Sequence, residues 1–307
     1  MPAKPKIIVA IPTRDRPNYL NATVLSVCRQ AETFGHNIEV VVSDAASKRA
    51  KAAKNAELMA RLRKKFPSVP IHYYPPGRVA PLKRLLEAAS IGEKNSFREL
   101  TSARGHWGSH RNRLALLAAF HGGEDAVFLH LDDDTPLFRL VRGRLKKNPR
   151  DELSLFLKGF RQARANGRVG YGGTIVGVPD AFTSVGDPHQ RKRLSVVLKL
   201  DARTYSEGHG GSARILSFEG LQVPYKPFGI SEDVEHCFRI GFLESGSVGG
   251  LGEIPMAMHI GVMGAKSPRR ARNIKLNASR NAGLEDAYLF WPYLVEKASK
   301  LGAVARH

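Results

Sequence analysis

The sequence predicts an α/β protein with a mixed, mainly parallel central sheet that is covered by helices on both faces. Three observations support this fold class. In the first half, short apolar runs alternate with longer segments of helical periodicity, and those runs are apolar throughout instead of alternating with polar residues. The second half is less regular. Continuous apolar runs are typical of parallel strands buried on both faces, and strand-helix alternation produces such sheets.

The elements of the first half follow in this order. Strands are expected at residues 7–11, 38–42, 71–74 and 126–131, and helices at about 17–31, 47–65 and 110–120. Residues 75–107 are rich in Pro, Gly, Lys and Ser, which predicts a long surface connection with one helix near 82–89. This succession indicates a Rossmann-like sheet.

The second half mixes strands and helices without strict alternation. Helices are expected at about 151–165, 232–242 and 284–300, and strands near 169–176, 195–200 and 214–218. Residues 264–281 carry six cations and no acid, which predicts a basic loop before the last helix.

Charge is the unusual feature of the composition. The chain has 307 residues, 42% hydrophobic and 25% charged, which are ordinary values for a globular protein. However, 48 Lys and Arg against 28 Asp and Glu give a net charge of +20. A polyanionic partner is therefore expected: nucleic acid, an acidic lipid surface or an acidic glycan.

Cysteine usage and hydropathy indicate a cytoplasmic protein. The two cysteines, Cys28 and Cys237, lie in expected amphipathic helices, where small buried thiols are common, so a disulfide scaffold is not expected. The first apolar run is too short and wrongly flanked for a signal peptide, and no run is long enough to cross a bilayer.

The sequence His130-Leu131-Asp132-Asp133-Asp134 follows directly on an apolar strand. Adjacent carboxylates repel one another, and a divalent cation with a preference for oxygen ligands would stabilise them. This pattern indicates a Mg²⁺ or Mn²⁺ site. The alternative is a strand-end turn whose acids cap the next helix or face solvent.

Four segments together resemble family 2-like GT-A glycosyltransferases: IIVAIPTRDRP with IEVVVSDAAS, then GSHRNRLALLAAFHGGEDAVFLHLDDD, PFGISEDVEHCFRIGF and MAMHIG. The segments occur in the family's order over most of residues 6–262. The resemblance implies a GT-A fold and transfer of a sugar from a nucleoside-diphosphate sugar to a hydroxyl acceptor, with Mn²⁺ or Mg²⁺ as cofactor.

The same resemblance implies a nucleotide-sugar site. Asp44 would recognise the base, although Ser43-Asp44-Ala45-Ala46-Ser47 departs from the usual Asp-Asp-Gly-Ser pattern and leaves the base open. Arg111 would pair with diphosphate or base, Asp132 with the ribose, and Asp134 with the metal; Asp133 is expected to be the least constrained. The floor of the pocket would be formed by Ile11, Pro12, Thr13 and Arg14.

The resemblance also implies catalytic residues in the second half. Asp233 would be the general base, with Glu232 as second choice. Ser231-Glu232-Asp233 is equally an ordinary helix start. His259 would be a further metal ligand, or else a packed core histidine. A basic set, Lys266, Arg269, Arg270 and Arg272, would cover the donor phosphates or contact the acceptor, or else form a solvated loop.

On this basis residues 1–135 form a nucleotide-sugar-binding half, residues 136–263 the acceptor-binding and catalytic half of the same domain, and residues 264–307 a basic loop and C-terminal helix. The favoured acceptor is a hydroxymethylated pyrimidine in DNA, because the excess charge suits a polyanion and an unmodified base offers no suitable alcohol. An anionic lipid at a peripheral membrane, a cell-envelope component and a small molecule are alternatives. So is a non-catalytic nucleic-acid-binding protein. A nicotinamide-dependent dehydrogenase is disfavoured because no Gly-rich turn follows the first strand.

Overall fold

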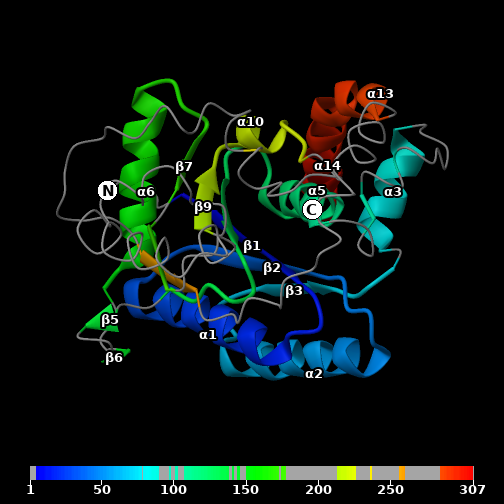
Figure 1. The fold of residues 1–307 in the computed structure, drawn as a ribbon. Helices are drawn as coiled ribbons and strands as arrows, with labels where there is room; N and C mark the ends of the chain where they lie inside the picture. Colours follow the sequence, from blue (N-terminus) through cyan, green and yellow to red (C-terminus); the bar gives the residue numbers. More distant parts are fainter. Residues whose placement is uncertain are drawn as a thin grey trace, which may run out of the picture.

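The computed structural model describes residues 5–77, 79–89, 97, 101–102, 107–137, 140–141, 144–145, 150–172, 174–177, 213–225, 236, 256–259 and 284–306. Its centre is a six-stranded sheet in the order β3-β2-β1-β4-β9-β7 (Figure 1). These strands are β1 (Ile7–Thr13), β2 (Ile38–Asp44), β3 (Ile71–Tyr74), β4 (Val127–Leu131), β7 (Gly170–Gly172) and β9 (Ala213–Leu216).

The sheet is mixed and mainly parallel, as predicted. Strands β1, β2, β3 and β4 pair in parallel, while β9 runs antiparallel to both of its neighbours. The strands of the βαβ succession thus all end at the same edge, and this edge receives the loops that follow β1, β2 and β4.

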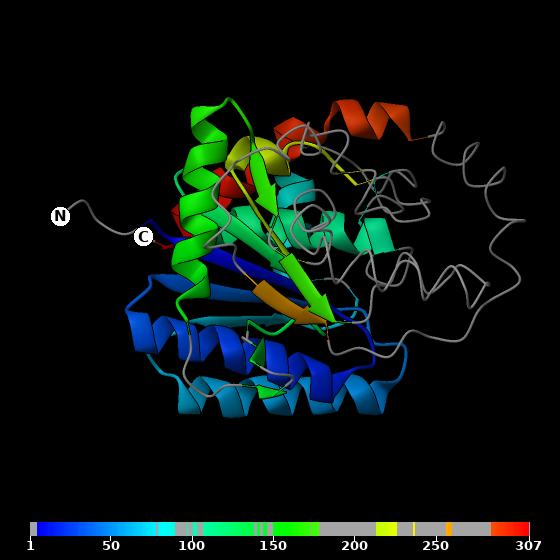
Figure 2. The ribbon, with the colours of Figure 1, turned by 60° about the vertical axis from the view of Figure 1, so that its left-hand side comes forward.

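Helices cover both faces of the sheet (Figures 1 and 2). One face packs against α1 (Pro17–Phe34), α2 (Arg49–Lys65) and α6 (Glu152–Ala165). The other packs against α3 (Ala80–Ala88), α5 (Trp107–Gly122) and α14 (Trp291–Arg306), with the short helices α10 (Phe218–Leu221) and α13 (Glu285–Leu289) beside them. The predicted fold class is therefore confirmed.

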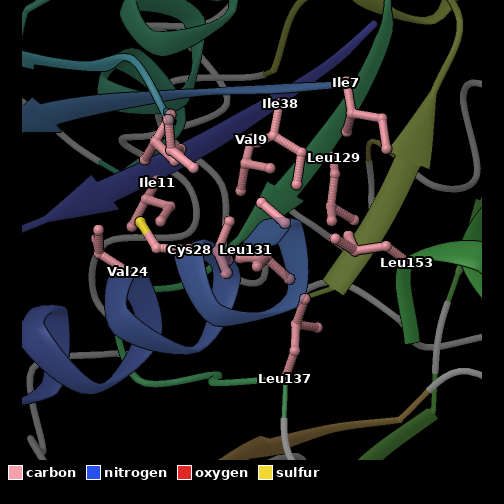
Figure 3. Packing of buried hydrophobic residues seen from close by; sticks show 14 of the residues in the cluster. Ile7, Val9, Ile11, Val24, Cys28, Ile38, Leu129, Leu131, Leu137 and Leu153 are labelled. Carbon is pink, nitrogen blue, oxygen red and sulfur yellow. The ribbon is translucent and has the colours of Figure 1, made fainter. Parts of the chain in front are cut away.

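The side chains of β1 show why its sequence is apolar throughout. Ile7, Val9 and Ile11 enter the core on the α1 side, whereas Ile8 and Ala10 enter the core on the α5 side. Figure 3 shows the first set beside Leu129 and Leu131 of β4, with Cys28 of α1 packed among them. A strand buried on both faces has no polar side to present. Cys28 is a buried free thiol, as expected.

Several expected elements differ from the structure. The expected strand 169–176 is divided between β7 and β8 (Thr174–Gly177), and β8 pairs with β10 (Met256–His259) in a separate parallel pair. The expected last helix is two helices, α13 and α14. Pro292 lies in the first turn of α14, the position where a residue without a backbone N–H loses no helical hydrogen bond.

A hairpin of β5 (Leu140–Val141) and β6 (Arg144–Leu145) was not expected. The expected strand 195–200 and, apart from His236, the expected helix 232–242 lie outside the described residues.

The division at residues 135 and 263 stays a prediction. Helix α14, from the third segment, packs against α5 of the first, so the C-terminal helix contributes to the core beneath the sheet. Within the described part of the chain, no helix has the length and apolar character needed to cross a bilayer.

Candidate active site

The predicted site residues of the first half meet at the carboxyl edge of the sheet. Thr13 at the end of β1 pairs in register with Asp44 at the end of β2, and Ala10 pairs with His130 of β4. The residues after β4 therefore arrive beside the end of β1. The hydroxyl of Thr13 donates to Oδ2 of Asp133 at 2.7 Å, which joins the two strand ends directly.

Asp132 is the most accessible of the three aspartates. Its side chain is 23% exposed, against 5% for Asp133 and 4% for Asp134. Nη2 of the buried Arg111, in the first turns of α5, donates to Oδ1 of Asp132 at 2.9 Å. The structure thus brings Arg111 and Asp132, two of the predicted site residues, into direct contact.

Asp133 is held by two threonines, and its expected place as the least constrained aspartate of the nucleotide-sugar site stays a prediction. Besides the Thr13 hydroxyl on its carboxylate, its backbone carbonyl accepts a hydrogen bond from the Thr23 hydroxyl of α1 at 2.8 Å. Burial, reinforced by the adjacent Asp134, raises the pKa of Asp133 to about 7. Sequence spacing does not reveal these two threonine donors.

Asp134 is buried and lies against Arg16, which the sequence analysis did not select. Nη1 of Arg16 is 2.7 Å from Oδ2 of Asp134 and 3.5 Å from Oδ1 of Asp133. The available signal was the spacing in Thr13-Arg14-Asp15-Arg16, which places a second guanidinium in the loop after β1. Like-charged neighbours are stable here because a cation and a hydroxyl donor offset their repulsion.

The loop after β1 is held in an uncommon conformation. Asp15 has a φ of 57°, a left-handed conformation that aspartate adopts more readily than most residues. Its carboxylate accepts hydrogen bonds from the backbone N–H groups of Ser47 and Lys48 at 3.1 and 3.3 Å, which ties this loop to the loop after β2. Asp15 lies between Arg14 and Arg16, so this connection holds the backbone that carries both arginines.

Arg14 lies beside an exposed aromatic ring. Its guanidinium is 5.0 Å from the centre of the Trp107 ring, which begins α5 and is 39% exposed. Burial lowers the pKa of Arg14 from its ordinary value. Pro12 and Thr13, which precede Arg14 in the chain, are buried. The carboxyl edge therefore presents a flat aromatic surface next to the guanidinium group of Arg14.

Asp44 stands at the predicted strand end with a fully bonded carboxylate. Oδ1 accepts from the backbone N–H of Ala46 at 2.7 Å, and Oδ2 accepts from Asn55 at 2.9 Å and from the Tyr73 hydroxyl at 2.6 Å. The side chain is buried. These contacts join β2 to α2 and β3, and a role in base recognition stays a prediction.

Arg111 lies next to a buried polar cluster that is centred on Tyr225. Asn112 exchanges two hydrogen bonds with the backbone of Tyr225, at 2.8 and 2.7 Å. The Tyr225 ring lies 5.8 Å from the Arg111 guanidinium, and its hydroxyl contacts Arg214 and Nδ1 of His130, the latter at 3.2 Å. No pattern in the sequence pointed to Tyr225, which follows a proline in an irregular segment.

The remaining predicted residues are not placed by the structure. Asp233, Glu232 and the basic set, Lys266, Arg269, Arg270 and Arg272, lie outside the described residues. The backbone of His259 ends β10, in register with Gly177, but its side chain belongs to the undescribed part of the structure. These assignments stay predictions.

A second group of ionisable side chains lies at the opposite edge of the sheet. Among the described residues, Glu39, His72 and His121 form the one set of three whose potential ligand atoms all lie within 4.8 Å of one another. Hydrogen bonds from His72 and Lys6 outweigh burial and lower the pKa of Glu39 to about 2. Burial lowers the pKa of His121 to about 3, so its ring is neutral.

Comparison with known proteins gives matches among solved structures. No protein-family model matches the chain, and no curated protein does. A mannosyltransferase from Pyrobaculum calidifontis, in complex with GDP-Man and Mn²⁺, is 13% identical over 99% of this chain and 76% of that one, with a TM-score of 0.49. Glucosyl-3-phosphoglycerate synthase from Mycobacterium tuberculosis is 13% identical over 94% and 80%, with a TM-score of 0.40. Mannosyl-3-phosphoglycerate synthase from Rubrobacter xylanophilus is 12% identical over 92% and 75%, with a TM-score of 0.39.

Proposed function

We propose that this protein is a metal-dependent glycosyltransferase that moves a sugar from a nucleoside-diphosphate sugar to a hydroxyl acceptor. The observation that carries the proposal is that Asp132 paired with Arg111, and Asp134 paired with Arg16, follow directly on the carboxyl end of β4. The loop after β1 adds Arg14, stacked on Trp107. Ligands of open α/β sheets bind at this edge. Carboxylates suit a divalent cation, and planar guanidinium groups suit phosphate.

The donor atoms fit a hard divalent cation. Asp134 would hold Mn²⁺ or Mg²⁺ through carboxylate oxygen, with His259 as a further ligand, while Asp132 would contact the ribose. A bound ion would supply positive charge to the diphosphate as its bond to the sugar breaks.

The surrounding residues would bind and orient the donor. Arg111, fixed by Asp132, and Arg14, placed over Trp107, would contact the diphosphate or base. Pro12 and Thr13 would form the floor of the pocket, Asp133 would fix the Asp132–Asp134 segment through Thr13, and Asp44 would recognise the base.

The transfer itself needs a base on the acceptor side. The acceptor oxygen would form the new bond to the anomeric carbon while the bond between that carbon and the diphosphate oxygen breaks. Asp233 would accept the hydroxyl proton, with Glu232 as second choice, and the nucleoside diphosphate would leave with the bonding electrons. Lys266, Arg269, Arg270 and Arg272 would cover the donor phosphates or contact the acceptor.

We propose a hydroxymethylated pyrimidine in DNA as the acceptor. Helix α2 supports this choice, because its outer surface and the residue before it carry exposed cations with Glu57 as the only acid in the helix. These cations are Lys48, Arg49, Lys54, Arg61, Arg63, Lys64 and Lys65. Neutralising phosphates releases counterions, so binding should weaken steeply with salt. An anionic lipid, a cell-envelope component or a small molecule would be the acceptor if DNA is not labelled.

The first test measures donor hydrolysis and sugar transfer with Mn²⁺ over a panel of nucleotide sugars, with hydroxymethylated DNA and acidic liposomes as acceptors. We expect labelling of the DNA that requires metal and falls by roughly 100-fold or more in Asp134→Ala, since several kcal/mol of charge stabilisation is lost. Asp125→Ala is the matched control, because Asp125 is an exposed aspartate just before β4. We expect it to retain full activity.

The other outcomes separate the alternatives. Metal-dependent hydrolysis without DNA labelling keeps the glycosyltransferase and rejects the DNA acceptor, and labelled liposomes would identify a lipid acceptor. No turnover of any donor, combined with salt-sensitive DNA binding that persists in Asp134→Ala, would contradict the enzyme and favour a non-catalytic nucleic-acid-binding protein.

A further inference from the structure

We propose that Glu39, His72 and His121 form a zinc site at the edge of the sheet opposite the candidate active site. The three residues come from the start of β2, from β3 and from the end of α5. Glu39 lies two residues before Val41, which pairs with His72, so both side chains leave the sheet on the face that α5 covers. His121 reaches them from that helix.

The two distances from Glu39 to the histidines are close to those of tetrahedral coordination, and all three pairs of potential ligand atoms lie within 4.8 Å. Oε2 of Glu39 is 3.2 Å from Nε2 of His72 and 3.7 Å from Nδ1 of His121. Ligand atoms bound at about 2.0–2.1 Å to a tetrahedral ion lie about 3.3 Å apart. The rings of His72 and His121 are stacked, with centres 3.7 Å apart and planes inclined by 26°, so the more exposed His72 ring has to rotate out of the stack to direct its lone pair at a shared ion.

The other atoms of two of these ligands are already held. The Tyr74 hydroxyl is 2.6 Å from Nε2 of His121, which leaves Nδ1 directed toward Glu39. Nζ of Lys6 lies 2.5 Å from Oε1 of Glu39, which leaves Oε2 directed toward the histidines. Metal-binding histidines and carboxylates are commonly oriented by such outer partners.

The chemistry of the set selects the metal. Two imidazoles and one carboxylate are typical ligands of zinc and similar transition ions, whereas Mg²⁺ prefers sites made of oxygen. The His72 side chain is 33% exposed, which gives an ion and a completing water a path from solvent. Glu39 and Asp44 occupy opposite ends of β2, about 17 Å apart at the usual strand rise. This site is therefore distinct from the aspartate cluster and does not depend on the proposed function.

The test is a zinc titration of chelator-treated protein by calorimetry in excess Mg²⁺, with the melting temperature measured in parallel. We expect one zinc ion per chain, and a rise in melting temperature because the ion binds only the folded state. His72→Ala should weaken binding at least tenfold and abolish that rise, while Asp134→Ala should leave both unchanged. His72 is the residue of choice because it is the least buried ligand.

A pair of tyrosine variants separates metal binding from general damage to the fold. Tyr74→Phe keeps all three ligands but removes the partner of His121, and we expect zinc affinity to fall about 10- to 100-fold. Tyr73→Phe removes the neighbouring hydroxyl, which bonds Asp44 on the other face, and should leave zinc affinity unchanged. The proposal is overturned if the protein does not bind zinc, or if His72→Ala and Glu39→Gln bind it as tightly as the unchanged protein.

Discussion

At the scale of single residues, Arg16 places its guanidinium on the carboxylate that we propose as a metal ligand. Nη1 lies 2.7 Å from Oδ2 of Asp134, and the side chain is only partly buried. A divalent cation at Asp134 would compete with this contact. Arg16 therefore sets how strongly the aspartates attract a metal ion.

Arg16→Gln tests this competition. We expect Mn²⁺ to bind up to about 5-fold more tightly in the variant, because the metal no longer has to displace a partly exposed ion pair that contributes up to about 1 kcal/mol. A Mn²⁺ titration of the donor-free protein measures the change. Arg29→Gln, an exposed residue of α1, repeats the change of charge without the contact. Weaker binding in Arg16→Gln than in Arg29→Gln would mean that Arg16 supports the metal ligand.

At the scale of elements, α5 is fixed at both ends. Its first turns carry the residues that hold Asp132 and Tyr225, and its last turn receives hydrogen bonds from Arg306 of α14 to the carbonyls of Phe120 and His121, at 2.8 and 2.9 Å. A displacement of α14 would therefore move the helix that carries Arg111. Close packing of the two helices links the C-terminal segment to the candidate active site.

Gly302→Ala should disrupt this packing. A Cβ at Gly302 would lie 1.6 Å from the carbonyl oxygen of Phe120, a backbone atom that cannot move aside without shifting α5. We expect a loss of about 2–3 kcal/mol in the free energy of unfolding. This is the upper end of the losses that an extra methyl group in a packed core usually causes. Denaturant unfolding measures it. Val304→Ala, on the exposed surface of the same helix, should change stability by less than about 0.5 kcal/mol. Equal stability of the two variants would show that the helices are not packed this closely.

At the scale of the whole molecule, buried ionisable groups make stability depend on pH. Burial lowers the pKa of three histidines, to about 3 for His110 and His121 and well below its ordinary value of 6.5 for His130. They stay neutral in the folded protein but bind protons in the unfolded chain below about pH 6.5. Each therefore costs stability as the pH falls.

Asp133 acts in the opposite direction. Its pKa of about 7 means that the folded protein keeps a proton that the unfolded chain releases above its ordinary pKa of 3.8. Three histidines against one aspartate leave a net uptake of about two protons on unfolding near pH 5, or roughly 2–3 kcal/mol of stability per pH unit. We expect the free energy of unfolding to fall between pH 6.5 and 5, measured by denaturant titration with a chelator present. A constant or rising stability over this range would contradict the assignment of neutral buried histidines.

Much of the fold could be predicted because the determining signals are local. The apolar runs 7–11 and 38–42 lie within β1 and β2, and the run 126–131 begins one residue before β4; their lack of polar alternation correctly indicated burial on both faces. Element ends were less predictable. Helix α5 begins at Trp107 instead of His110, since its first polar residues are buried and bonded by distant groups.

The sequence by itself determined that three aspartates follow β4 and that they share an edge with Thr13 and Asp44, because parallel strands end together. Only the tertiary structure decided which donor reaches each carboxylate: Arg111 for Asp132, Thr13 for Asp133 and Arg16 for Asp134. It alone also brought Glu39, His72 and His121 together. The physical reason is that residue spacing fixes the face of a strand or helix, whereas contacts between distant side chains depend on how the packed elements orient each rotamer.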